Sequence, residues 1–213
     1  MKVVVTVGLP GSGKSSHVKV IGEKYGFPQL ETGQILLDEM SEKGIEITSD
    51  NIRKFTEEKK HISDSYFTEK ATEIVKSQYR DKRLVFLSGM RAPSEIEFLR
   101  REFGENNVFV IAFLASRKSR YSRIAQPRKG IDFIDRSTRE LEKQDAKKRK
   151  EDQLLASYNE FVKKDLKELI FGEGNIIALA DYFVITESEK YPHKTWGTTN
   201  KEVEEIIKEI LKQ

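Results

Sequence analysis

A glycine-rich segment is the first place in this sequence where residue types and spacing suit a particular chemistry. Gly8-Leu-Pro-Gly-Ser-Gly-Lys14-Ser15 satisfies the pattern G-x-x-x-x-G-K-[ST] in full, and it follows the apolar run Val3–Val7. Glycines let successive backbone N–H groups turn inward where a helix begins, which makes a concave site for an anion. The segment therefore predicts a phosphate-binding loop.

The residues of this loop have expected roles in nucleotide binding. Lys14 is expected to contact the β- and γ-phosphates of ATP, and the Ser15 hydroxyl is expected to ligate Mg²⁺. The residues expected to bind the triphosphate are Gly8, Pro10, Gly11, Ser12, Gly13, Lys14, Ser15 and Ser16. The alternative is a glycine-rich turn that contains Lys and Ser by coincidence. The strand before the loop and the helix after it favour nucleotide binding.

Alternating apolar and charged segments predict the fold that must position this loop. Strands are predicted at 2–9, 83–89, 107–115 and 181–187. Helices are predicted at 14–24, 34–43, 49–60 and onward to 77, 94–103, 117–126, 135–169 and 201–212. The alternation predicts an α/β protein with the three-layer P-loop NTPase fold and a mainly parallel central sheet. Ligands of such sheets bind at the carboxyl ends of the strands.

Length and composition narrow the class of protein. The 213 residues suit one medium-sized domain, and 37% are hydrophobic and 34% charged. A net charge of +3 offers little general attraction to nucleic acid or membranes, so a polyanion would need a local basic patch. The absence of cysteine excludes disulfides and thiolate metal sites. Without a membrane-spanning run or a secretory signal, we expect a cytoplasmic protein with no membrane partner.

The segments after the loop favour a small-molecule kinase over a switch GTPase. A switch GTPase reads its base with an Asn-Lys-x-Asp segment, which this sequence lacks. Instead, Thr32-Gly33 stands at the start of a predicted helix, and Arg91 follows two residues after Gly89 at the end of a predicted strand. The next predicted strand leads into the arginine-rich helix "SRKSRYSRIAQPRKG".

At these residues the chain resembles the archaeal adenylate-kinase-related P-loop family, which is similar to adenylate and dephospho-CoA kinases. The resemblance covers nearly the whole chain. It rests on "GLPGSGKS", Thr32-Gly33, "KGIEITSDNIRKF", Gly89 and Arg91, the "RYSR…RKG" helix, and "KDLKELIFGEGNIIALADYFVITE", which is the most family-specific stretch.

The resemblance implies an ATP-dependent phosphotransferase with Mg²⁺ as cofactor and a small nucleotide-type acceptor. Thr32, Gly33 and Arg91 would face the acceptor's sugar and phosphate. The cations implied in catalysis are Lys14, Arg91, Arg120, Arg123 and Arg128, of which the last three would close over the phosphates from a lid. The resemblance further implies one kinase-like domain spanning 1–213, with a helical acceptor-binding region at about 33–80 and a helical lid at about 117–165.

The sequence departs from the family where relatives carry charge. Gln34 and Leu37 stand in the helix where relatives place an aspartate and an arginine after Gly33, and Ser88 stands where they carry Asp or Glu. Lys164 replaces an arginine, which removes bidentate geometry but keeps the charge. These changes affect the acceptor and metal sides and leave the donor loop intact.

Three alternatives follow from these departures. The protein acts on a different acceptor, recruits a carboxylate such as Asp38 or Asp132 from elsewhere, or serves as a regulatory module that binds nucleotide with little or no turnover. The charged stretch 136–160 would grip RNA in one interpretation. Acidic residues on both sides of its basic cluster favour a solvated extension of the lid.

Aromatic and imidazole side chains near the chain ends have modest interpretations. Trp196 would stack on the nucleotide base or anchor a surface loop, and the anchor is favoured. His17 and His61 are expected to be packing or surface residues. The identity of the acceptor, the choice between ATP and GTP and the oligomeric state are left open.

Overall fold

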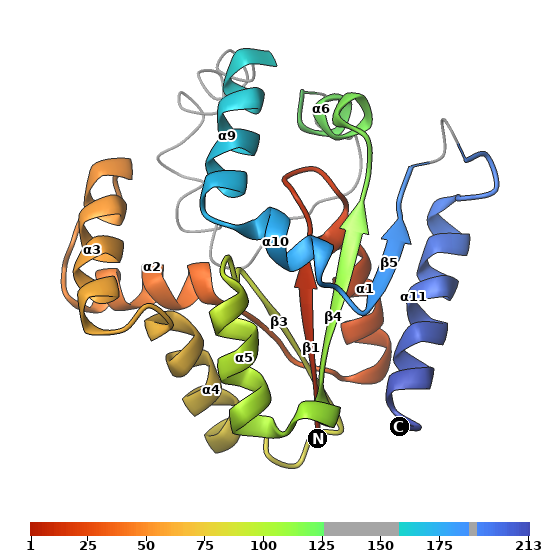
Figure 1. Ribbon diagram of the computed structural model, residues 1–213, viewed down its shortest axis with the longest axis horizontal. Helices are drawn as coiled ribbons and strands as arrows, with labels where there is room; N and C mark the ends of the chain where they lie inside the picture. The colour runs from red at the N-terminus through yellow and green to blue at the C-terminus, as the bar shows by residue number, and fades with distance from the viewer. Residues whose placement is uncertain (126–157, 188–190) are drawn as a thin grey trace.

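Parallel strands with helices on both faces make up the part of the chain that the computed structural model describes, which is residues 1–125, 158–187 and 191–213 (Figure 1). The strands are β1 (Lys2–Val7), β2 (Gln29–Glu31), β3 (Leu84–Ser88), β4 (Val108–Leu114) and β5 (Tyr182–Ile185). They lie in the order β2-β3-β1-β4-β5, and every neighbouring pair is parallel. This is the three-layer α/β arrangement with a parallel central sheet that the sequence predicts.

Helices cover the sheet on both sides. They are α1 (Lys14–Tyr25), α2 (Thr32–Glu42), α3 (Ser49–Ile62), α4 (Tyr66–Gln78), α5 (Pro93–Phe103), α6 (Arg117–Ala125), α9 (Tyr158–Ile170), α10 (Glu173–Ala178) and α11 (Trp196–Ile210). The apolar side chains of α1 and α11 pack on one face, and those of α4, α5 and α10 pack on the other. Within the described ranges, no helix has both the length and the apolar composition needed to cross a bilayer.

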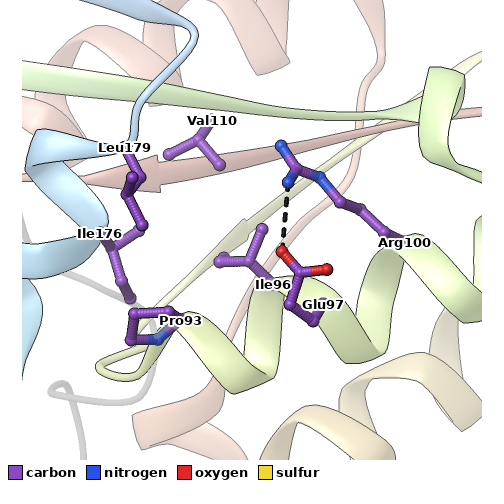
Figure 2. Close-up of a pocket in the computed structure, with 7 residues that line it drawn as sticks. All are labelled: Pro93, Ile96, Glu97, Arg100, Val110, Ile176 and Leu179. Atoms are coloured by element: carbon purple, nitrogen blue, oxygen red, sulfur yellow. Dashed lines mark hydrogen bonds and ion pairs between the residues drawn. The ribbon is translucent and has the colours of Figure 1, made fainter.

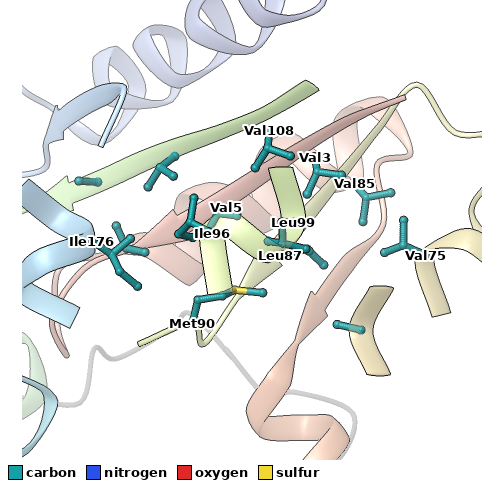
Figure 3. Packing of buried hydrophobic residues seen from close by; sticks show 14 of the residues in the cluster. Val3, Val5, Val75, Val85, Leu87, Met90, Ile96, Leu99, Val108 and Ile176 are labelled. Carbon is teal, nitrogen blue, oxygen red and sulfur yellow. The ribbon is translucent and has the colours of Figure 1, made fainter. Parts of the chain in front are cut away.

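The central strand β1 shows why its sequence is a continuous apolar run. Val3, Val5 and Val7 belong to the core cluster beneath α4, α5 and α10, whereas Val4 belongs to the cluster beneath α1 and α11. Successive side chains of a strand point to opposite faces, so a strand covered on both faces needs apolar residues at every position. Figure 3 shows Val3 and Val5 of β1 in the first cluster with Leu99 of α5.

The structure confirms the four predicted strands and corrects one predicted helix. The helix expected from 49 onward to 77 is two helices, because Ser63 adopts an extended backbone after α3. The Ser63 hydroxyl accepts a hydrogen bond from the Ser65 N–H at 3.2 Å, an alternative to helical pairing that serine readily provides. The sequence did not predict β2 or α10, which have only three and six residues. Of the helix predicted at 135–169, the part before 158 lies outside the described residues.

One carboxylate of α11 forms hydrogen bonds and an ion pair with α1, the helix that starts at the glycine loop. Glu204 of α11 accepts hydrogen bonds from Lys24 at 2.6 Å and from Tyr25, both at the end of α1, and it pairs with Lys208 at 2.7 Å. Hydrogen bonds from Lys208, Lys24 and Tyr25 lower the pKa of Glu204 from 4.5 to about 2. Ionisation of Glu204 therefore raises the free energy of unfolding.

We expect the substitution Glu204→Gln to lower the melting temperature most above pH 4.5. Because the folded-state pKa is depressed, the stabilisation by Glu204 is complete above pH 4.5 and is lost as pH falls through about 2. The difference in melting temperature between the two proteins should therefore shrink across that interval, as followed by circular dichroism.

A matched control is Glu205→Gln, the next residue of α11, which forms no ion pair with any residue that the structure describes. Its melting-temperature difference should not change with pH over the same interval. A difference for Glu204→Gln that stays constant below pH 4.5 would contradict the proposed fastening of α11 to α1.

Candidate phosphate-binding site

The glycine loop lies where the order of the strands reverses. β1 occupies the middle of the sheet, with β3 on one side and β4 on the other. Since all strands are parallel, the loops at 8–13, 89–92 and 115–116 meet at the same carboxyl edge, above which α6 and α9 lie (Figure 1). Parallel sheets bind ligands at such a reversal point.

The carbonyl oxygens of the loop are held by hydrogen bonds from protein groups. Leu9 O accepts from the Ser12 N–H at 3.0 Å, and the next three carbonyls accept from side chains. These further bonds are Pro10 O from Arg120 Nη1 at 3.1 Å, Gly11 O from Arg123 Nη1 at 3.0 Å, and Ser12 O from Thr186 Oγ1 at 2.6 Å. Four consecutive carbonyl oxygens of the loop thus accept hydrogen bonds from other groups of the protein.

The amides of the same loop are left available. Within the described residues, these backbone N–H groups donate no hydrogen bond: Gly11, Gly13, Lys14, Ser15 and Ser16. Gly11 and Gly13 have φ values of +81° and +91°, a left-handed conformation that favours glycine. Free amides at the start of a helix, with the carbonyls tied elsewhere, form a site suited to an anion.

Glycine is required in the loop by space as well as by conformation. A β-carbon at Gly11 would lie 2.7 Å from the carbonyl oxygen of Arg120, closer than real contacts allow. Lys14 follows at the start of α1, is half-buried and forms no ion pair with a described residue, and the Ser15 side chain is exposed. Both side chains are therefore available at the loop.

A buried ion pair fixes the arginine that holds Pro10. Arg120 Nη1 and Nη2 donate to the two carboxylate oxygens of Asp165 at 2.6 Å each, and the residues are 5% and 2% exposed. The guanidinium carbon also lies 5.2 Å from the ring centre of Phe161. The pair joins α6 to α9 and holds both helices at the loop.

The second arginine links the loop to the end of β5. Arg123 Nη2 donates to Thr186 O at 2.7 Å, and Nη1 donates to Thr186 Oγ1 at 3.0 Å. The resemblance implied that Arg120 and Arg123 face the phosphates, whereas the structure places their guanidinium groups on the carbonyls of the loop. Arg128 lies outside the described residues. A contact between these three arginines and phosphate stays a prediction.

The predicted acceptor-side residues meet at the end of β3. Gly89 has φ +94°, and a β-carbon there would lie 2.3 Å from Thr32 Oγ1, so the start of α2 packs directly on this turn. Arg91, two residues later, forms an ion pair from Nε to Glu168 Oε2 at 3.0 Å and stacks on Phe171 at 5.2 Å. Gly33 is exposed beside Thr32.

The structure shows the local contacts of the residues that depart from the family pattern. Gln34 Nε2 donates a hydrogen bond to Asp38 Oδ1 at 2.8 Å on the exposed side of α2. The Asp38 carboxylate, which the sequence suggested as a replacement for the family's missing acid, is therefore bonded to Gln34. Leu37 packs against the small core of Leu36, Met40 and Phe55 between α2 and α3. Ser88 pairs with Thr6 and with Glu31 in the sheet. Asp132 lies outside the described residues.

One residue at the loop was missed by the sequence reasoning. Glu173, the first residue of α10, is 6% exposed, and its Oε1 accepts a hydrogen bond from the Gly8 N–H at 3.0 Å. The available signal was an acid between two glycines in the otherwise apolar stretch "IFGEGNIIALA". Within the described residues, no three carboxylate, imidazole or thiol groups lie together as metal ligands.

A small hollow elsewhere is too small to be this site. It lies between α5, β4 and α10 and has a volume of about 20 Å³, enough for a water molecule. Figure 2 shows its lining: Pro93, Ile96, Glu97, Arg100, Val110, Ile176 and Leu179. Arg100 donates to Glu97 at 3.3 Å within it. A nucleotide does not fit there.

The aromatic side chain at the start of α11 packs on the helix of the loop. The rings of Trp196 and His17 stack with centroids 4.2 Å apart, and His17 is 3% exposed. The His17 Nδ1 lies 2.6 Å from Asn200 Oδ1. Trp196 is the first residue of α11 and packs this helix on α1, whereas the favoured interpretation places it in a surface loop. His17 is a packing residue. His61 is exposed on α3.

Comparison with known proteins places the chain among P-loop proteins. Residues 7–140, more than half of the chain, match the family described as "AAA domain". A UPF0200 protein of Thermococcus kodakarensis is 28% identical over 98% of this chain and 100% of its own length. A shikimate kinase from Bacteroides thetaiotaomicron has a TM-score of 0.54 at 11% identity, covering 97% of this chain and 98% of that one. A shikimate kinase from Acinetobacter baumannii in complex with shikimate has a TM-score of 0.52 at 16% identity, covering 100% of this chain and 94% of that one.

We expect Asp165→Asn to destabilise the protein by about 3–5 kcal/mol, because it leaves the buried Arg120 guanidinium without its counter-charge. Urea unfolding followed by circular dichroism measures this change. The control Asp50→Asn removes an exposed carboxylate of α3 that pairs with Arg53 and Lys54, and it should leave the urea midpoint nearly unchanged. Equal effects of the two substitutions would show that the buried pair does not hold α6 and α9 together.

Proposed function

The chain belongs to the AAA domain family, and from this membership, the P-loop kinase-like fold and the geometry of the glycine loop we propose that it is an ATP-dependent phosphotransferase acting on a small nucleotide-type acceptor. The observation that carries the proposal is the division of the loop's polar groups. Its carbonyls are bound by Arg120, Arg123 and Thr186, while its amides are available. That division suits a triphosphate and not a cation.

The residues of the loop can supply what phosphoryl transfer requires. Lys14 neutralises charge on the β- and γ-phosphates, and the amides orient them. The Ser15 hydroxyl, exposed at the start of α1, would hold Mg²⁺, which offsets phosphate charge when bound. Arg120 and Arg123 act in this proposal by keeping the loop in shape. Catalysis of this kind is mostly alignment and charge neutralisation, which a rigid loop provides.

The acceptor side presents cations around an aromatic ring. Arg91, Lys60 of α3 and Lys167 of α9 lie 5.2, 5.6 and 5.7 Å from the ring centre of Phe171. Lys60 and Lys167 form no ion pair with a described residue. Phe171 is 39% exposed, so the cluster borders solvent. Cations with a partly exposed ring suit an acceptor that carries both an anionic group and a planar ring, as a nucleotide does.

A second candidate function is a regulatory module that binds nucleotide with weak or no turnover. Leu37 is the observation that favours it, because an apolar residue packed between α2 and α3 cannot contact an acceptor phosphate as an arginine does. Ser88 adds to this alternative by offering no negative charge at the end of β3. Both functions use the same donor loop, so turnover with an acceptor separates them.

The main test incubates the protein with Mg-ATP and a panel of nucleoside monophosphates and dephospho-CoA, and follows formation of ADP. At least one acceptor should raise ADP formation above the acceptor-free rate, and Lys14→Ala should abolish both turnover and ATP binding. The control Lys19→Ala changes a lysine on the exposed side of the same helix and should change neither.

The outcome selects between the two functions. If no acceptor raises turnover while Lys14→Ala still abolishes ATP binding, the regulatory module replaces the kinase. ATP binding that survives Lys14→Ala would contradict both.

Substitution of Arg91, Lys60 or Lys167 by alanine should weaken use of the acceptor much more than binding of ATP. The loss of one charged contact of about 1.5–3 kcal/mol corresponds to roughly a 10- to 100-fold fall in kcat/KM for the acceptor. Titration calorimetry with ATP and steady-state kinetics with the acceptor measure the two effects. Arg101→Ala is a matched control, because Arg101 lies over the Phe98 ring at 5.9 Å on α5 and should have no effect. Equal losses for ATP and acceptor would remove this cluster from the acceptor side.

A further inference from the structure

Glu173 is a buried carboxylate with one polar partner in the described part of the chain. It is 6% exposed, and its Oε1 accepts the Gly8 N–H at 3.0 Å. No described Lys, Arg or His lies within ion-pair distance of it. The contrast is Asp165, which is also buried and has two hydrogen bonds from Arg120.

The position of Glu173 is between the donor loop and the acceptor side. Its contact with Gly8 places it at the end of β1, where the donor loop begins. Gly172, the residue before it, has φ +98°, and a β-carbon there would lie 2.6 Å from the carbonyl oxygen of Arg91. The turn from α9 to α10 therefore packs on the loop after β3, and the carboxylate stands where the two loops meet.

A buried carboxylate without a counter-charge at this place is unfavourable both for folding and for binding of a triphosphate. Burial of a charge without a counter-charge disfavours folding, so buried charges in proteins are normally paired or bind metal ions. The negative charge also opposes binding of a triphosphate to the amides that follow Gly8. A cation that arrives together with the triphosphate would remove both costs. Mg²⁺ is such a cation, since protein sites commonly bind it with one or two carboxylates, water and substrate phosphates.

We propose that Glu173 holds the Mg²⁺ of the bound nucleotide through a metal-coordinated water, in place of the acid that related kinases carry at the position of Ser88. This inference rests on the proposed function. Ser15 would contribute the hydroxyl ligand, and Glu173 the negative charge. Asp38, which the sequence offered as the substitute, is exposed on α2 and bonded to Gln34.

The test compares ATP binding with Mg²⁺ and with a chelator in Glu173→Gln. Glutamine keeps an oxygen that can accept the Gly8 N–H and removes only the charge. The variant should lose about 10- to 100-fold of the Mg²⁺-dependent gain in ATP affinity, the range for removing a residue that supports a metal through its ligands. Its affinity for ATP without Mg²⁺ should stay the same or rise. Titration calorimetry measures both affinities, and electron paramagnetic resonance of Mn²⁺ added with ATP measures the metal directly.

The matched control is Asp181→Asn. Asp181 also accepts one strand amide, the Val110 N–H at 2.7 Å, but it precedes β5 and so lies at the opposite edge of the sheet. This variant should keep the full Mg²⁺ dependence. Glu173→Asp, which keeps the charge on a shorter side chain, should retain part of it.

Five outcomes of this experiment support or overturn the inference or the proposed function. Retained fold with a reduced Mg²⁺ dependence in Glu173→Gln supports the inference. An unchanged Mg²⁺ dependence overturns it and leaves the proposed function standing, as does an equal loss of affinity with and without Mg²⁺. Failure of both Glu173 variants to fold where Asp181→Asn folds overturns it in favour of a structural role. Absence of ATP binding by the unmodified protein overturns the proposed function itself.

Discussion

The structure depends on the hydrogen bonds that hold the carbonyl oxygens of residues 9–12 away from the space above the glycine loop. Residues 9–12 carry four carbonyl acceptors and only three amide donors, because Pro10 has no N–H, so the segment can bind an anion only when its acceptors are satisfied elsewhere. Arg120, Arg123 and Thr186 satisfy three of the four acceptors. These side chains come from positions more than a hundred residues along the chain, so the loop's shape is a property of the whole fold.

The arginines that hold the loop are themselves held. Arg120 is buried, and its charge is matched by both oxygens of Asp165, with Phe161 stacked against the guanidinium. Burying an ion pair costs desolvation that the Coulomb attraction offsets only with good geometry, and two bonds of 2.6 Å provide that geometry. The main effect of the pair is to position α6 and α9 rather than to add stability, because Arg120 bonds both Asp165 of α9 and the carbonyl of Pro10 in the glycine loop. Glu173 extends the arrangement from α10 to Gly8 at the start of the loop.

Several features of the fold could be predicted because their causes are local. The apolar run of β1 reflects burial on both faces, and Gly11 and Gly13 reflect positive φ at the turn into α1. Short elements escaped prediction, since the three residues of β2 and the six of α10 are too few to show a period. The break at Ser63 escaped for another reason: a serine hydroxyl bonding a nearby amide is compatible with helix or turn until the packing of α4 selects one.

What the sequence determined by itself was the glycine loop and its immediate frame: the strand before it, the helix after it, and the parallel sheet that surrounds them. These depend on residue type and spacing within a few residues, which periodicity and glycine conformation report directly. Only the tertiary structure decided which charges face which partners. Arg120 was recognisable as a cation near the site, but its pairing with Asp165 joins positions 45 apart, and the Glu173 contact with Gly8 joins positions 165 apart. Distances of that kind follow from how the helices pack on the sheet, and no local pattern of residues records them.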